Sequence, residues 1–184
     1  MRRPLSHTAA LALLLACTTA LAEGAHQHGV ASLQIVAEGN SLVITLDSPL
    51  DNLLGFERGP RSEAERAAVR AMARRFHAGA TLAQPTPAAA CLWREAQLAS
   101  DVIAPALLAR TEQAAAAQPP AAGGHADLQA TLSFECSQPQ ALKGVALAGL
   151  FQVFPRLRQL DVALVAPGVQ RGFRLGPQKP MLAW

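Results

Sequence analysis

The regular alternation of apolar and polar residues between positions 31 and 48 constrains the fold of this chain more than any other feature. Three apolar residues at every second position precede the dipeptide Gly39-Asn40, and three more follow it with the same spacing. A period of two is typical of a β-strand with one buried face, and Gly-Asn is a common two-residue hairpin turn. A pairing that puts Glu38 opposite Ser41 places the apolar residues of both strands on one face. The predicted pairs include Leu33 with Leu46 and Ile35 with Ile44, and Ala37 and Leu42 complete the apolar set.

Further segments alternate in the same way and are predicted to be strands. In the first of them we expect Leu92, Ala96 and Leu98 to point to one side. In the second, every other residue from Leu128 to Cys136 is apolar, which again indicates one buried face. The predicted strands after the hairpin are 91–98, 128–136, 160–164 and 173–175, with Pro167-Gly168 as the turn between the last two.

Two helices are predicted between these strands. The first begins at Ser62, because Ser62 and Glu65 have the spacing of a capping box, and it extends to His77 before Gly79. The second follows Pro139 and stops at Pro155, which cannot continue a helix. Their predicted apolar stripes are Val69, Met72 and Phe76 in the first helix, and Leu147, Leu150, Phe151 and Phe154 in the second.

This order of elements predicts an α+β fold. We expect antiparallel β-sheet in a β-β-α-β-β-α-β-β order, covered by the two helices, with residues 23–184 forming a single domain. Residues 50–60 are interpreted as a turn-rich passage, and the low-complexity residues 110–124 as a surface excursion. The order ββα recurs weakly in both halves of the chain, which leaves open a division into two small subdomains.

The first residues predict export. Arg2 and Arg3 form a basic region, an apolar stretch follows at 8–17, and Ala20-Leu21-Ala22 is a small-x-small cleavage signature. The apolar stretch is too short to span a bilayer, which requires about 20 residues. We therefore predict that residues 1–22 are a cleaved signal peptide, that the mature chain has no transmembrane segment, and that the protein is periplasmic.

An alternative reading of the same segment is a lipoprotein signal. Residues 14–17 (LLAC) loosely match a lipoprotein box, in which Cys17 would be acylated and anchored to a membrane. Removal of the signal also changes the charge, because it takes two arginines and no acidic residue from the 16 basic and 13 acidic residues. The mature chain is nearly neutral and has no basic stretch interleaved with aromatic residues, so we expect no binding to nucleic acid.

Two cysteines remain after Cys17 is removed. An even pair in an oxidising compartment favours a disulfide between Cys91 and Cys136. Closing a loop of about 46 residues stabilises a fold by roughly 4 kcal/mol in the chain-entropy model. Two buried free thiols are the alternative.

Motifs of common enzymes are missing from the mature sequence. It contains no phosphate-binding loop, dinucleotide fingerprint, nucleophile elbow or HExxH sequence. We therefore expect a protein that is not an enzyme. A hydrolase whose serine, histidine and aspartate meet only in space stays open as a third alternative, because such groups need no common spacing in the sequence.

His26 and His28 are separated by one residue just before the first predicted strand. If the strand extends back to them, a period of two puts both imidazoles opposite to Leu33 and Ile35, away from the core. Two neutral imidazoles on one exposed face suit a borderline metal such as zinc. Extending the hairpin register places Asp51 across from His28, as a third ligand or as a hydrogen-bond acceptor for one. An incidental His-x-His near a terminus is the alternative.

Several motifs in this order resemble the ZrgA-type periplasmic zinc-uptake accessory proteins. They are the HxHG sequence at 26–29, the SPxxNLxGFE sequence at 48–57, Cys91, FECSQPQAL at 134–142 and GLFQVFPRLRQLDV at 149–162. The resemblance covers nearly the whole mature chain. It implies a soluble periplasmic zinc binder that assists a high-affinity zinc ABC transporter or its solute-binding protein, and not an enzyme.

Two departures from the family pattern bear on the zinc site. The family often has a long histidine-rich tract between its cysteines, whereas this chain has an Ala/Pro/Gly-rich stretch, and Arg58 stands where the family commonly has histidine. These departures motivate an alternative function, a periplasmic protein-interaction module of the same fold with degenerate or no metal binding. The candidate zinc ligands are His26, His28 and His125, with Glu57, Asp51 or Asp127 as oxygen donors.

Overall fold

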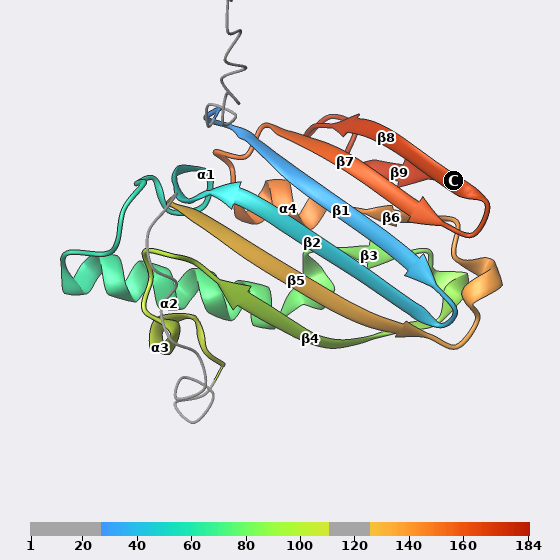
Figure 1. Ribbon diagram of the computed structural model, residues 1–184, viewed down its shortest axis with the longest axis horizontal. Coiled ribbons are helices and arrows are strands. Elements are labelled where there is room, and N and C mark those ends of the chain that lie inside the picture. The colour runs from blue at the N-terminus through green and yellow to red at the C-terminus, as the bar shows by residue number, and fades with distance from the viewer. Residues whose placement is uncertain (1–26, 111–125) are drawn as a thin grey trace, which may run out of the picture.

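A computed structural model describes residues 27–110 and 126–184, whose strands form two sheets (Figure 1). The large sheet has six strands in the order β4-β5-β2-β1-β7-β8, and the small sheet has the order β3-β6-β9. The predicted signal peptide at 1–22 lies outside the described residues, as does the predicted surface excursion except for its first residue. The strands are β1 (Val30–Glu38), β2 (Ser41–Pro49), β3 (Gln84–Pro85), β4 (Cys91–Ala99), β5 (Asp127–Cys136), β6 (Gly144–Ala146), β7 (Gln159–Ala166), β8 (Val169–Leu175) and β9 (Met181–Ala183).

The hairpin predicted from the alternating pattern is confirmed. β1 and β2 are antiparallel, with Ile35 opposite Ile44 and Leu33 opposite Leu46. All four side chains are buried on the same face of the sheet. Gly39 adopts a φ of 56°, the left-handed conformation that a tight hairpin turn requires. This hairpin forms the centre of the large sheet.

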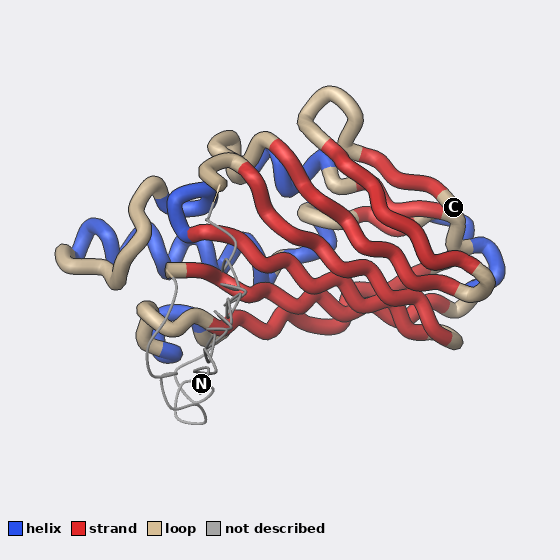
Figure 2. The backbone as a smooth tube through the Cα atoms, turned by 45° about the horizontal axis from the view of Figure 1, so that its top comes forward, coloured by secondary structure: helices blue, strands red, loops and turns tan. Residues whose placement is uncertain are grey.

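The helices and the small sheet cover one face of the large sheet, which we call the inner face (Figure 2). The longest helix, α2 (Glu63–His77), buries Val69, Met72, Ala73 and Phe76. Phe76 stacks on Phe154, which follows helix α4 (Ala148–Val153), with ring centroids 5.2 Å apart. The short helices α1 (Leu50–Leu54) and α3 (Pro105–Leu108) complete the set. Among the described helices, none has the length and apolar run that crossing a bilayer requires.

The direction of one strand pair differs from the prediction. The α+β class is confirmed, but β1 pairs with β7 in parallel, with Val30 opposite Gln159. β2 is flanked by β1 and β5, so the free edge of β1 remains for the second half of the chain. That half leaves β5 at the hairpin-turn end of the sheet and returns beneath it through β6 and α4 (Figure 1). It therefore enters β7 beside the start of β1 and runs in the same direction.

The order of elements also differs from the prediction, because the structure contains α1, β3, α3, β6 and β9 in addition to the expected elements. The expected helix after Pro139 is a 3-10 turn (Pro139–Ala141), then β6, then the short α4. A Cβ atom at Gly144 would collide with the Leu182 backbone, so β6 and β9 approach too closely for a helical segment there. The passage at 50–60, interpreted as turns, begins with helix α1.

A bulge in β4 overturns the predicted facing of its first residues. The register moves from Trp93 opposite Phe134 to Glu95 opposite Ser133, so one extra residue is inserted between them. As a result, Trp93 points to the inner face, where its ring meets Phe134 edge-on at 5.3 Å. Leu92 is 62% exposed and does not share a face with the inner residues of β4. A period of two holds only while the ladder is unbroken.

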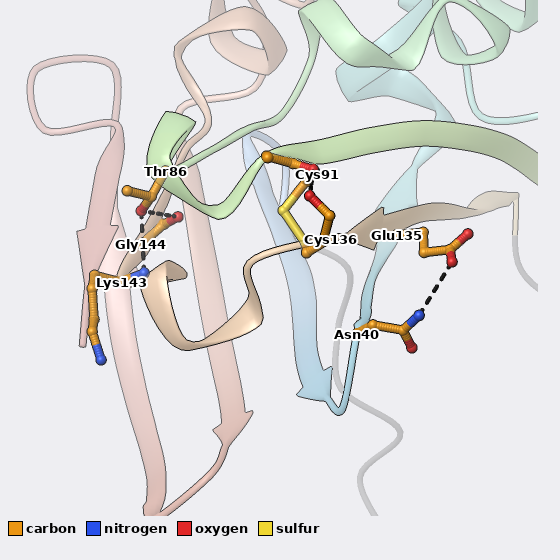
Figure 3. The surroundings of a disulfide bond; sticks show 9 residues. Asn40, Thr86, Cys91, Glu135, Cys136, Lys143 and Gly144 are labelled. Atoms are coloured by element: carbon orange, nitrogen blue, oxygen red, sulfur yellow. Dashed lines mark hydrogen bonds between the residues drawn. A yellow bond between two sulfur atoms is a disulfide. The ribbon is translucent and has the colours of Figure 1, made fainter.

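The predicted disulfide between Cys91 and Cys136 is confirmed (Figure 3). The two cysteines lie directly opposite each other at the start of β4 and the end of β5. Next to them, the backbone N–H of Cys136 donates to the Asn40 carbonyl at 2.7 Å. The disulfide therefore lies at the end of the large sheet that carries the β1–β2 turn, which we call the turn end.

The capping box at the start of α2 is confirmed and is reinforced by an arginine. Ser62 accepts from the Glu65 backbone N–H at 3.1 Å, and the Glu65 carboxylate accepts from the Ser62 backbone. Both oxygens of Glu65 also accept from Arg58, at 3.0 and 2.8 Å. The hydrogen bonds from Arg58 and from the Arg61 backbone lower the pKa of Glu65 from its usual 4.5 to about 2. Glu65 thus links the helix start to the preceding loop.

Replacing both Cys91 and Cys136 with serine should lower the free energy of unfolding by about 4 kcal/mol, since the bond closes a loop of some 46 residues in the unfolded chain. Urea denaturation of the oxidised protein and the double variant measures the difference. Reduced wild-type protein serves as the matched comparison, because it lacks the bond but keeps both sulfur atoms. Equal midpoints for oxidised and reduced protein would contradict the prediction.

The Glu65→Gln variant should show a pH-dependent loss of stability. Because folding lowers the pKa of Glu65 to about 2, its stabilisation is fully present above pH 4.5 and is lost as the pH falls towards 2. The difference in Tm between wild type and variant should therefore be largest near neutral pH and shrink in acid. Thermal unfolding between pH 2.5 and 7 tests this, with Glu38→Gln on β1 as the control. A difference that stays constant with pH would refute the linkage.

Candidate metal centre

Three potential metal donors meet at the end of the large sheet opposite to the turn end. His28 lies in the turn before β1, Asp51 lies in α1, and Glu57 follows that helix. The His28 Nδ1 atom is 3.2 Å from Asp51 Oδ2 and 3.7 Å from Glu57 Oε1. We call these three residues the His28 cluster, and this end of the sheet the His28 end. The His28 side chain is 68% exposed, so the cluster is open to solvent.

A glycine explains why His28 is not part of β1. Gly29 has a φ of 83°, which breaks the extended conformation, and the strand begins at Val30. The carbonyl of Gly29 accepts from the backbone N–H groups of Arg158 and Gln159 at 2.7 and 2.9 Å. The strand therefore does not extend back to His28, as the shared face of the two imidazoles would require. The predicted proximity of His28 to Asp51 is confirmed, but it arises from a turn that meets a helix.

Helix α1 places both carboxylates. It follows directly after Pro49, which ends β2, and it stops after five residues at Gly55. Gly55 has a φ of 82°, and its N–H donates to the Asp51 carbonyl at 3.0 Å, which closes the helix with a left-handed cap. The cap reverses the chain, so Glu57 returns towards His28. Asp51 and Glu57 thus reach one histidine from the two ends of one short segment.

Buried Asn52 fixes the helix to the turn that carries His28. Its side-chain oxygen accepts from the Gly29 N–H at 2.6 Å. Its side-chain nitrogen donates to the Val30 carbonyl at 2.9 Å and to the Ser48 hydroxyl at 3.2 Å. Asn52 is only 1% exposed, and its bonds to Gly29 and Ser48 are buried. Asn52 belongs to the SPxxNLxGFE motif, and an asparagine among leucines is the sequence signal for this role.

An arginine from the second half of the chain also reaches the His28 cluster. The Arg156 Nη1 atom is 3.8 Å from Asp51 Oδ1, on the carboxylate oxygen that does not face His28. The Arg156 side chain lies against Gly55, where a Cβ atom would be 3.2 Å from its Nε. No local pattern around position 156 predicts this contact, since it depends on the pairing of β1 with β7. Asp51 is therefore shared between an imidazole and a permanent cation.

Arg58 does not enter the His28 cluster. Its guanidinium binds Glu65 at the start of α2, and it lies over the Phe56 ring at 5.2 Å. The hydrogen bond to Glu65, with the attraction of its charge, raises the pKa of Arg58 further above its usual range. Arg58 therefore acts as an anchor for the start of α2.

Asp127 is the remaining candidate ligand among the described residues, and it lines a different cavity. Asp127 opens β5 opposite Pro49 and lines a separate cavity of about 240 Å³ together with Asp47 and Asp101. His26 and His125 lie outside the described residues. The residue after His125 is Ala126, whose carbonyl accepts from the Leu50 N–H at 2.8 Å, next to Asp51.

The His28 cluster presents one nitrogen and two carboxylates, which suit zinc. Over residues 27–110 and 126–184, no group of three or more His, Cys, Asp or Glu side chains is arranged to hold a metal ion. Both short contacts in the cluster use the same atom, Nδ1 of His28. A metal ion bound here would replace the proton that Nδ1 shares with the carboxylates. The geometry is that of a hydrogen-bonded cluster with metal-compatible donors.

Comparison with known proteins shows that the chain matches the model of one protein family. The family model described as ZrgA family zinc uptake protein matches residues 25–184. A search of curated proteins finds no match. The matched range contains every described residue, including the whole His28 cluster and the disulfide.

Replacing Asn52 with alanine should lower the free energy of unfolding by about 2–4 kcal/mol, because it leaves buried polar groups of Gly29, Val30 and Ser48 without their partner. Urea denaturation measures the change. The matched control is Asn40→Ala at the turn end, where an exposed amide bonds only to Glu135 and a change within about 0.5 kcal/mol is expected. Similar losses in both variants would show that the Asn52 bonds have no special weight.

Proposed function

Because the chain belongs to the ZrgA family of zinc uptake proteins, we propose that it is exported to the periplasm and captures or buffers zinc there. Family membership indicates a role in zinc uptake. The finer proposal is that zinc is carried cargo, that no catalytic step is involved, and that the cargo passes to a zinc ABC transporter or its solute-binding protein. The family match begins at residue 25, shortly after the predicted signal peptide at 1–22, which supports export.

The observation that carries the proposal is the spacing of donors around His28. Two ligands bound tetrahedrally to zinc at about 2.0–2.1 Å lie about 3.3 Å from each other. The His28 Nδ1 atom lies 3.2 Å from one carboxylate oxygen and 3.7 Å from another. Both distances are thus close to the spacing of two ligands on one zinc ion.

Binding at this cluster would proceed by ligand exchange. Only an unprotonated ring nitrogen ligates a metal, so in this proposal the Nδ1 proton that faces Asp51 would move to Nε2 of the same ring, or from a charged ring to solvent, as zinc binds. The two carboxylates supply most of the charge that offsets the ion. In this proposal His26 and His125, which lie outside the described residues, provide further nitrogen donors. Their neighbours along the chain, Gln27 and Ala126, lie at the His28 end of the sheet.

The exposure of the site supports release as well as capture. The side chains of His28 and Glu57 are 68% and 39% exposed, so a second protein can approach the ion directly. A zinc site with fewer than four protein ligands leaves a coordination position for water or for an incoming ligand. Transfer to a transport partner can then take place through a shared intermediate, without loss of the ion to solvent.

A second candidate function is a periplasmic interaction module that keeps the fold without binding zinc. The observation that favours it is Arg156, a permanent cation 3.8 Å from the best oxygen donor. The two candidates predict different zinc affinities, so a single titration separates them.

Untagged mature protein should bind Zn²⁺ in calorimetric titration, and His28→Ala and Asp51→Asn should each weaken binding by at least about ten-fold. A tag is avoided because added histidines would bind zinc themselves. The matched control is Asp161→Asn on β7, which removes an exposed carboxylate paired with Arg174 at 3.1 Å. Millimolar affinity that is equal in all four proteins would refute zinc binding and favour the interaction module.

A further inference from the structure

Arg156 lies beside both segments that carry the His28 cluster. Its guanidinium faces Asp51, and its side chain lies against Gly55, two residues before Glu57. Its backbone carbonyl is 3.5 Å from the position that a Cβ atom on Gly29 would occupy, next to His28. Arg156 thus comes from the loop after α4 to a place that only the folded chain creates.

We propose that Arg156 is a built-in competitor for zinc, which lowers the affinity of the His28 cluster and speeds release of the ion. The inference rests on the proposed function and deepens it by assigning control of affinity to one residue. The two carboxylate oxygens of Asp51 face different partners. Oδ2 faces His28, and Oδ1 faces Arg156. An ion that binds Asp51 must therefore share the carboxylate with the guanidinium or displace it.

A role in stability alone does not account for this placement. The Arg156 side chain is 61% exposed and lies 3.8 Å from its partner, and exposed ion pairs of this kind contribute little to folding. The charge acts more strongly on a divalent ion than on the single charge of Asp51. A unit charge about 6 Å from a divalent ion in water-like surroundings changes binding about ten-fold, before salt screens part of the effect.

A carrier protein that transfers its zinc ion to another protein benefits from such a residue. Tight binding would capture zinc at low concentration but would also slow its transfer to the next protein. Because the Arg156 guanidinium already lies beside Asp51, it can pair with the Asp51 oxygen again as the ion leaves. Arg156 would then act as a positioning residue for Asp51 in the empty site and as an opposing charge in the loaded site.

The test compares Arg156→Met with Arg156→Lys in the full mature protein, with Zn²⁺ as the ligand. Methionine keeps most of the stem that lies against Gly55 but removes the charge, whereas lysine keeps the charge. The matched control is Arg94→Met at the turn end, which removes an equally charged side chain from its partner Glu135. Kd is measured by calorimetry, and the dissociation rate by stopped-flow transfer of zinc to a fluorescent chelator.

The Arg156→Met variant should bind Zn²⁺ roughly three- to ten-fold more tightly in 0.1 M salt and release it more slowly by a similar factor. The lysine variant and Arg94→Met should stay within about two-fold of wild type. Because the effect is electrostatic, the gap between Arg156→Met and wild type should narrow in 0.5 M salt. A merely structural role would show no such dependence on salt.

Failure of this inference is distinguishable from failure of the zinc-binding proposal. If Asp51→Asn weakens binding but Arg156→Met binds no more tightly than wild type, zinc uses the cluster and the role of Arg156 is overturned. If wild type and Asp51→Asn bind equally weakly, the cluster is not a zinc site and both proposals fall. Tighter binding in Arg156→Met that persists unchanged in high salt would also overturn the electrostatic mechanism.

Discussion

The parallel pairing of β1 with β7 is the contact on which the rest of the structure depends. It joins the two halves of the chain, because β1 belongs to the first hairpin and β7 follows the small sheet and α4. At its start, the Gly29 carbonyl accepts from the N–H groups of Arg158 and Gln159. The same junction brings Arg156 to the segments that carry Asp51 and His28. Arg156 therefore joins the His28 cluster only when both halves are folded.

Much of the fold follows from the sequence, because the alternation of apolar and polar residues indicates which face of a strand is buried. It predicts the register of β1 and β2, including Ile35 opposite Ile44. It does not state which strand is the neighbour or in which direction that neighbour runs, since backbone hydrogen bonds do not depend on the side chain. For this reason the pattern does not predict the parallel pairing of β7 with β1. The bulge before Glu95 was missed as well, because one inserted residue reverses every later side chain without a local sequence mark.

The candidate site was predicted in part, for a reason that proved incomplete. The hairpin register placed Asp51 across from His28, and the two side chains are indeed 3.2 Å apart. The assumed strand is absent, because Gly29 turns the chain and α1 replaces the end of β2. The buried role of Asn52 requires packing that propensity does not describe. Arg156 lies more than a hundred residues from its partner, and sequence spacing carries no information about such a contact.

The position of the disulfide keeps its two sulfur atoms far from the His28 cluster. Cys91 and Cys136 lie at the turn end, separated from His28 by the length of β5, about 30 Å for a ten-residue strand. Thiolates are common zinc ligands, and many structural zinc sites are built from them. Oxidation removes these two sulfur atoms from competition, and distance prevents them from rejoining the ligand set. The oxidised fold thus separates a permanent covalent closure at one end of the sheet from the proposed zinc site at the other.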